Sequence, residues 1–370
     1  MRETELIRIS HGGSGFTEQE REDLHRAGGI LRRGGLVAFP TETVYGLGGD
    51  ALNPDSSRKI YAAKGRPSDN PLIVHIAEFD NIYRIASEVP ETAVELANAF
   101  WPGPLTMILR KSDAVPLETT GGLDTVAVRI PSHPVAQALI REGGGYVAAP
   151  SANTSGKPSP TLASYVVEDM DGRIDLIIDG GAVGIGLEST IVDLTVNPPQ
   201  ILRPGYITRE MLEQVVGEVA VDDTILQSPP DSRQAPRAPG MKYRHYAPEG
   251  DLTIVCGEAG KVVEYINRQS DRDRADGGKV GIIGTEEVLA GYRADVVRSV
   301  GSRLDEETIA HRLYAILREF DDEHVTKIYS EGFSAEGLGQ AIMNRLLKAA
   351  GHQVIDLDTL GGEENDSDWK

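Results

Sequence analysis

Apolar runs alternate with amphipathic stretches along most of the chain. Between about Glu18 and Val216, runs of strand length are separated by stretches in which apolar residues recur with helical spacing. The runs that predict strands are 35–39, 72–76, 105–109, 125–130, 146–149, 174–178 and 189–194. The stretches that predict helices are 55–63, 91–100, 133–141 and 162–169. This pattern predicts an α/β domain with one dominant sheet, and the strand list alone suggests a plain parallel one.

A second set of alternations begins after Asp251. The predicted strands are 252–255, 280–283, 294–297, 327–330 and 354–357, and the predicted helices are 261–268, 306–320 and 338–350. Strands and helices that alternate in this way predict a small, mostly parallel βαβ domain.

The two sets are separated by a stretch of different composition. Between about Asp222 and Gly250 the chain is rich in Pro, Ser, Asp and Arg, which is typical of a linker. The end of this stretch, M-K-Y-R-H-Y-A-P over 241–248, carries two tyrosines and three cationic or ionisable side chains that a spacer does not need. We therefore expect domains over 15–216 and 251–360, joined by a linker over 217–250 that docks elsewhere on the protein.

Composition and charge narrow the class of protein. With 370 residues, 40% of them hydrophobic and 25% charged, the chain is expected to form a folded protein of two domains. Cys256 is the single cysteine, which excludes an internal disulfide and a cysteine-rich zinc site. Neither a cleavable signal nor a membrane-spanning run is recognisable, so we expect a cytoplasmic protein. The formal charge of −20 argues against broad attraction to nucleic acid or anionic lipid.

Three polar clusters adjoin predicted strands: those over 40–49 and 148–161 follow or end one, and that over 64–71 precedes one. P-T-E-T-V-Y-G-L-G-G over 40–49 offers hydroxyls and flexible glycines for a small polar ligand, or forms a structural turn. K-G-R-P-S-D-N-P over 64–71 can grip phosphate or carboxylate oxygens, or lie solvated at the surface. A-A-P-S-A-N-T-S-G-K-P-S-P-T over 148–161 can hold an anion where a helix begins, or simply cap that helix. Taken singly, His75 is as consistent with a core histidine, and Arg129 with a surface ion pair.

The common nucleotide, zinc and hydrolase signatures are absent from the sequence. There is no G-x-x-x-x-G-K-[ST] phosphate loop, G-x-G-x-x-G fingerprint, H-E-x-x-H pair or G-x-S-x-G elbow. A domain of this kind that handles ATP must therefore use scattered cations and hydroxyls.

In their order along the chain, six motifs resemble the YrdC-type domain of threonylcarbamoyl-AMP synthases. They are P-T-E-T-V-Y-G-L-G, K-G-R-P-S-D-N-P-L-I-V-H, W-P-G-P-L-T, V-A-V-R-I-P, A-P-S-A-N-T-S-G and L-R-P-G. The linker motif P-G-M-K-Y-R-H-Y-A-P, followed by a βαβ domain, resembles the long two-domain form of that family. The resemblance implies a twisted, mixed sheet around a concave cavity and a small Rossmann-like C-terminal domain.

The resemblance also implies a reaction, in which L-threonine, bicarbonate and ATP give threonylcarbamoyl-AMP, pyrophosphate and water. A separate transferase complex would then modify position 37 of transfer RNAs that read codons beginning with A, so the chain need not hold nucleic acid stably. Mg²⁺ is expected to arrive with ATP, with no metal ligand from protein side chains. Positions that match threonine-binding residues of the family are Thr43, His75, Arg129, Ser151 and Ser189. Those that match ATP-binding residues are Arg66, Asn70, Thr125, Asn153, Thr161 and Arg203, and those that match the catalytic signature are Lys64, Arg66, Ser151 and Asn153.

The linker tyrosines prompt a further hypothesis. Labile carbamate and adenylate intermediates need shielding from water, so we expect Tyr246 and Tyr243 to reach the nucleotide as part of a closing loop. Two alternatives remain at this point. A non-catalytic RNA-binding module is disfavoured by the net charge, and a carbamoyl-phosphate-dependent relative with a zinc-finger-like cysteine set is disfavoured by the single cysteine.

Overall fold

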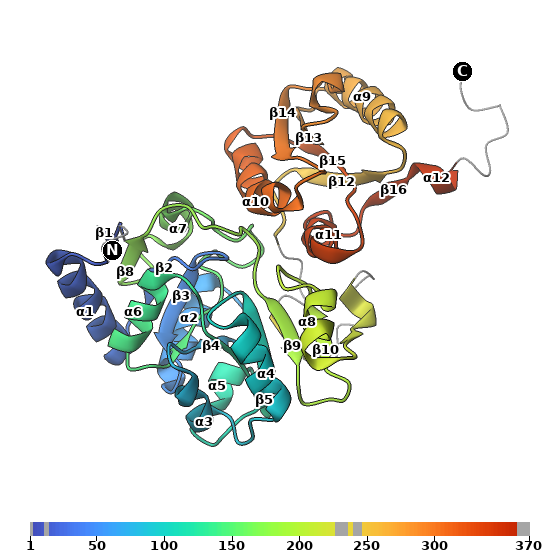
Figure 1. The fold of residues 1–370 in the computed structure, drawn as a ribbon. Helices are drawn as coiled ribbons and strands as arrows, with labels where there is room; N and C mark the ends of the chain where they lie inside the picture. Colours follow the sequence, from blue (N-terminus) through green and yellow to red (C-terminus); the bar gives the residue numbers. More distant parts are fainter. Residues whose placement is uncertain (1–2, 11–14, 226–235, 240–245, 361–370) are drawn as a thin grey trace. The chain divides into compact units, whose positions relative to one another are not determined.

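A computed structural model describes residues 3–10, 15–225, 236–239 and 246–360. The chain divides into two compact units, Met1–Tyr243 and Arg244–Lys370 (Figure 1). Within the described stretches, no helix combines the length and apolar character needed to cross a membrane.

The N-terminal unit is built on one large mixed sheet. Its strands are β1 (Glu5–Arg8), β2 (Val37–Phe39), β3 (Gly46–Asp50), β4 (Ile73–His75), β5 (Leu105–Arg110), β6 (Thr125–Arg129), β7 (Val147–Ala148), β8 (Leu176–Asp179), β9 (Thr190–Asp193), β10 (Gln200–Arg203) and β11 (Ala220–Val221). They lie in the order β1-β8-β2-β3-β7-β4-β6-β5-β9-β10-β11. Strand β6 pairs parallel with β4 and antiparallel with β5. The expected mixed sheet is thus confirmed, and the plain parallel arrangement suggested by the strand list is wrong.

Helices cover this sheet unevenly. They are α1 (Glu18–Arg32), α2 (Pro54–Lys64), α3 (Ile82–Ile85), α4 (Glu91–Phe100), α5 (Leu117–Thr120), α6 (Pro134–Glu142), α7 (Ala163–Met170) and α8 (Arg209–Val216), with short 3₁₀ turns at Phe79–Asn81 and Asp223–Ile225. One sheet face packs from β8 to β10 on α2, α3, α4, α7 and α8. On the other face, α1 and α6 cover only the part from β1 to β7 in the strand order.

The rest of the second face carries a small apolar cluster. Because side chains alternate along a strand, Val126 and Val128 of β6 enter the helix-covered core while Ala127 points to the opposite face. There Ala127 joins apolar side chains of β4, β5, β9 and β10, together with Ala238 from the linker segment. No helix residue belongs to this cluster among the described residues, so a linker segment, rather than a helix, packs against this part of the sheet.

Several elements of the N-terminal unit were not predicted. Strand β1 lies in the N-terminal extension, for which the sequence indicated no role, and pairs parallel with β8 at the sheet edge. Its four side chains are mostly exposed, so it lacks the alternation on which strand prediction depends. Strand β3 is G-L-G-G-D, which composition assigns to a turn, and helix α1 begins with a capping box between Thr17 and Glu20.

The C-terminal unit is a five-stranded parallel sheet with helices between its strands. It contains β12 (Asp251–Cys256), α9 (Ala259–Ala275), β13 (Val280–Thr285), a 3₁₀ turn at Leu289–Gly291, β14 (Val296–Gly301), α10 (Glu306–Asp322), β15 (Lys327–Glu331), α11 (Gly337–Ala349), β16 (Val354–Asp356) and α12 (Leu357–Leu360). The strand order is β14-β13-β15-β12-β16. All four pairings are parallel, which confirms the predicted βαβ domain.

Candidate active site

Arg129 occupies the end of β6 on the incompletely covered face. Parallel pairing places it beside His75 at the end of β4. Its guanidinium, only 4% exposed, donates to Thr43 Oγ1 at 3.0 Å and to Glu42 Oε1 at 2.6 Å. A third hydrogen bond, from Nε to the carbonyl oxygen of Gly103, is 3.3 Å long. Three of its five N–H groups are therefore used to fix its plane, and two remain for a ligand.

His75 is buried and uncharged. Its Nδ1 lies 3.2 Å from the carbonyl oxygen of Ile73, and its ring packs edge-on against Phe39. Burial, reinforced by the nearby positive charge of Arg129, lowers the pKa of His75 to about 3. At neutral pH the imidazole is therefore a neutral hydrogen-bonding group.

A second arginine lies near the start of β9. Arg203 is 4% exposed and donates from Nε to the carbonyl oxygen of Ser189 at 3.0 Å and from Nη2 to the Ser189 hydroxyl at 3.2 Å. The same hydroxyl lies 2.7 Å from Thr106 Oγ1 on β5. Two hydroxyls and a guanidinium are thus held together by residues of β5, of β10 and of the loop directly before β9.

A buried lysine organises the third cluster. Helix α2 ends at Lys64. Gly65 follows in the left-handed conformation at φ 61°, which terminates the helix and changes the direction of the chain. The Lys64 ammonium, only 3% exposed, donates to the carbonyl oxygens of Ser151 and Asn153 at 2.5 and 2.6 Å. The Ser151 hydroxyl donates to Asn153 Oδ1 at 2.5 Å. Lys64, Ser151 and Asn153, predicted as one signature, are therefore in direct contact.

Backbone hydrogen bonds join these groups into one site. The amide of Leu47 donates to Pro150 and that of Ala152 to Tyr45, each at 2.8 Å, so the loop around Ser151 runs beside the segment that carries Thr43. The amide of Gly186 donates to the carbonyl oxygen of Thr43 at 3.0 Å, which brings in the segment preceding Ser189. These bonds therefore place the loop around Ser151 and the segment that precedes Ser189 beside the segment that carries Thr43.

The predicted ATP residues are more widely spread. Thr125 begins β6 on the same face as Arg129, four residues and roughly 13 Å away by the strand rise. The side-chain amide of Asn70 is buried and has no hydrogen-bond partner. Thr161 is buried, and Arg66 is half-buried one residue beyond Gly65. These positions fit an elongated ligand better than a compact one, and the unsatisfied amide of Asn70 marks a place where a polar ligand is expected.

The two linker tyrosines cannot be placed at the site. Tyr243 lies outside the described residues. Tyr246 is buried in the C-terminal unit, where its ring lies 5.1 Å from that of Tyr314 between centroids. Their expected contact with the nucleotide stays a prediction.

Another part of the linker does dock beside the site. Arg237 donates to Asp222 Oδ2 at 2.6 Å and lies 3.6 Å from Asp193 Oδ2. Ala238 packs into the apolar cluster on the sheet face, and the carbonyl oxygen of Pro239 lies 3.5 Å from Nη1 of Arg203. The segment 236–239 is thus fixed at one end by charge and reaches a predicted ATP residue at the other.

Sequence reasoning missed two residues that contact the site. Glu42 lies inside the first motif between Thr41 and Thr43, and the sequence gives no sign that the structure buries both threonines. Thr106 is the one polar residue in the apolar run 105–109, at the position that alternation sends to the site face. In the described stretches, no group of three or more His, Cys, Asp and Glu side chains is arranged to hold a metal ion.

Two family models cover most of the chain. Residues 29–205 match the Sua5, YciO and YrdC model, described as "Telomere recombination". Residues 207–351 match a model described as "Threonylcarbamoyl-AMP synthase, C-terminal domain".

Individual relatives agree with these models over nearly the same length. The chain is 49% identical to a threonylcarbamoyl-AMP synthase of Pyrococcus abyssi over 329 residues, which are 89% of this chain and 94% of the relative. It is 50% identical to a threonylcarbamoyl-AMP synthase of Bacillus subtilis over 331 residues, 89% of this chain and 93% of the relative. It matches the crystal structure of P. abyssi Sua5 complexed with L-threonine at a TM-score of 0.89 and 46% identity, covering 96% of this chain and 100% of that one.

Proposed function

Because the chain belongs to the family of two-domain threonylcarbamoyl-AMP synthases, we propose that it converts L-threonine, bicarbonate and ATP into threonylcarbamoyl-AMP, pyrophosphate and water. In chemical terms it would be a nucleotidyltransferase, since an adenylyl group moves from ATP to a carbamate oxygen. The observation that carries the proposal is the meeting of Arg129, Thr43 and the Lys64 cluster around one loop. The relative solved with L-threonine supports it.

The cations of the site suit the charges of these substrates. A carboxylate, a carbamate and a triphosphate repel one another when they share a cavity, and fixed positive charges offset that repulsion without reorganising. Arg129 and Arg203 are buried and held by hydrogen bonds, and Lys64 is fixed by two carbonyl oxygens. Such preorganised charge can replace the phosphate loop that the sequence lacks.

Threonine would bind at the Arg129 end of the site. The two N–H groups of Arg129 that remain available match a carboxylate. The neutral groups nearby, His75 and the hydroxyls of Thr43 and Ser189, suit the substrate hydroxyl because they add no charge. Ser151 completes the predicted threonine set from the loop beside Thr43.

ATP would extend from the Lys64 cluster along the part of the sheet that α1 and α6 do not cover. The residues that would hold it are Arg66, Asn70, Thr125, Asn153, Thr161 and Arg203, together with Tyr243 and Tyr246 of the linker. The threonine amine would first combine with carbon dioxide derived from bicarbonate, and the carbamate oxygen would then attack the α-phosphorus in line, with pyrophosphate leaving on the opposite side. Mg²⁺, when bound to the triphosphate, would offset the charge of the leaving pyrophosphate.

The product, threonylcarbamoyl-AMP, would be released and used by a separate enzyme. A mixed carbamic–phosphoric anhydride is labile in water, so the linker over 217–250 is proposed to shield it. A transferase complex would then use the threonylcarbamoyl group on transfer RNA at position 37, in the cytoplasm. The chain itself would need no stable contact with nucleic acid.

Pyrophosphate release tests this proposal. We expect release from ATP only when threonine and bicarbonate are both present, because the carbamate is the nucleophile. Arg66→Ala should lower turnover by orders of magnitude, whereas Arg58→Ala, which removes an exposed surface arginine paired with Asp55, should leave it unchanged. Full activity of Arg66→Ala would show that its assignment is wrong.

A further inference from the structure

One buried carboxylate oxygen at the site has no partner. The Glu42 side chain is 13% exposed, and its Oε1 accepts the 2.6 Å hydrogen bond from Arg129. Its Oε2 is buried from solvent and accepts no hydrogen bond. An unsatisfied charged oxygen is costly in a protein interior, so one that persists at a binding site indicates that a ligand supplies the missing donor.

The position of this oxygen is fixed by the backbone around it. The Thr41 hydroxyl accepts from the amides of Thr43 and Val44 at 3.2 and 3.3 Å and donates to the carbonyl oxygen of Val44 at 2.6 Å. The carbonyl oxygen of Glu42 itself accepts from the amide of Ile185 at 2.8 Å. With the turn closed and its outer side tied to a second segment, the backbone of Glu42 is fixed, and the hydrogen bond from Arg129 holds its carboxylate.

Glu42 and Arg129 together present opposite charges side by side. An α-amino acid carries a carboxylate and an ammonium group on one carbon, and so needs a cation and an anion at adjacent positions. Arg129 offers two N–H groups, and Glu42 offers one oxygen, within a pair already in contact at 2.6 Å. Arg129 alone would not distinguish an amino acid from a simple hydroxy acid, because both carry the carboxylate.

We infer that Glu42 binds the α-amino group of the substrate through Oε2, while Arg129 binds the carboxylate. This inference rests on the proposed function, since it concerns the same threonine site. Glu42 would hold the nitrogen that reacts with carbon dioxide in a single orientation and would restrict the site to amino acids. Its role is distinct from that of His75 and Ser189, which suit the substrate hydroxyl.

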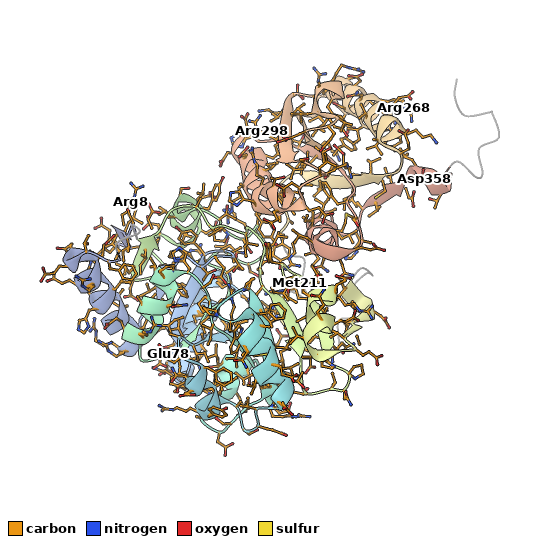
Figure 2. All side chains as sticks on the ribbon, in the orientation of Figure 1. Arg8, Glu78, Met211, Arg268, Arg298 and Asp358 are labelled. Atoms are coloured by element: carbon orange, nitrogen blue, oxygen red, sulfur yellow. The ribbon has the colours of Figure 1, made fainter. Side chains whose placement is uncertain are left out.

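The test compares two ligands that differ only in the amine. L-Threonine and 3-hydroxybutanoate share the carboxylate and the hydroxyl, and the second lacks the amino group. Binding of each is measured by calorimetry to the full-length protein, to Glu42→Gln and to Glu78→Gln. Glu78, labelled in Figure 2, is an exposed carboxylate that pairs with Arg141 and serves as the matched control.

We expect the native protein and Glu78→Gln to prefer threonine by about 10- to 100-fold, the range of one charge-assisted hydrogen bond. Glu42→Gln should lose most of that preference by binding threonine more weakly, while its affinity for 3-hydroxybutanoate stays the same or rises.

Two results would overturn the inference while leaving the proposed function intact. In one, Glu42→Gln binds both ligands more weakly by the same factor, which would mean that Glu42 only holds Arg129 in place. In the other, Glu42→Gln keeps the native preference for threonine. Failure of the native protein to bind threonine at all would instead contradict the proposed function, and the inference with it.

Discussion

Single side chains at this site are held in defined charge states by burial. His75 is the clearest case, because burial and the charge of Arg129 together lower its pKa to about 3. A protonated imidazole would lie beside a guanidinium and compete with it for the substrate carboxylate. Keeping His75 neutral therefore leaves Arg129 as the cation of the threonine pocket.

The depressed pKa of His75 predicts a pH dependence of stability. In the unfolded chain His75 takes up a proton as the pH falls through about 6.5, whereas in the folded chain it stays neutral down to about 3. Its contribution to stability is therefore complete above pH 6.5 and is lost between about 6.5 and 3. Between pH 7 and 5 we expect this residue to remove about 2 kcal/mol from the free energy of unfolding. Urea unfolding at the two pH values measures it.

His75→Gln supplies the comparison for that experiment. The variant lacks the titrating group, so its free energy of unfolding should change less between pH 7 and 5 than that of the native protein, whatever its absolute stability. An equal change in the two proteins would mean that His75 is not buried in the neutral form.

Some residues of the site could be predicted from the sequence, and others could not. Motif order located Lys64, Ser151 and Asn153, which the structure brings into contact. It did not select Glu42, because a carboxylate in a Gly-rich turn is ordinarily solvated, and only the three-dimensional structure shows that one of its oxygens is buried without a partner.

At the scale of elements, the docked linker segment is the feature closest to catalysis. Residues 236–239 cover apolar side chains on the sheet face and reach Arg203 through the carbonyl oxygen of Pro239. Arg237 anchors the segment to Asp222 and Asp193, near the ends of β11 and β9. The Arg237 side chain is half exposed, whereas the carboxylates of Asp193 and Asp222 are largely buried, so the anchor contributes to stability as well as to position.

Removing this anchor should affect both substrate use and folding. We expect Arg237→Ala to raise the KM for ATP several-fold and to lower Tm, because it leaves the largely buried carboxylates of Asp193 and Asp222 without this cation. Steady-state kinetics and a thermal melt measure the two effects. Arg237→Lys should recover part of the affinity, since the charge is retained. An unchanged KM in Arg237→Ala would mean that segment 236–239 is only a tether.

Element prediction succeeded where apolar periodicity was strong and failed where it was weak. The apolar runs of β5 and β6 and the long helix α10 were located by periodicity alone. Strand β1 was not predicted because its side chains are mostly exposed. Strand β3 was not predicted because its glycines give no pattern of apolar side chains. Both segments form strands because they pair with a neighbouring strand, and the intrinsic β-strand preference of their residues does not decide it.

At the scale of the whole molecule, the two units have different tasks in the proposed function. Every predicted threonine-binding residue lies in the N-terminal unit, whereas the C-terminal unit carries the buried Tyr246. Periodicity was enough to predict a separate parallel domain, because strands such as β12 and β13 are regular and largely buried. It could not predict the mixed order of the large sheet, which depends on pairings between strands distant in the chain.

Truncation separates the contributions of the two units, provided that the cut leaves the strands and helices of the N-terminal unit intact. A cut after Gly205 removes β11 and helix α8, whose Leu212 is buried in the core, and should destabilise the remainder. A cut after Ile225 keeps both. We expect residues 1–225 to melt cooperatively and to bind threonine, with turnover reduced at least about tenfold because the linker is missing. Native turnover by this fragment would contradict a catalytic role for the linker.

The central claim is that one site joins threonine, bicarbonate and ATP in a single product. The most direct measurement supplies ¹⁴C-labelled bicarbonate and follows both the label and the released pyrophosphate. We predict one labelled carbon in a product that contains both AMP and threonine for each pyrophosphate released, and no label in such a product when threonine is omitted. Release of pyrophosphate without incorporation of label into an AMP-containing product would contradict the account.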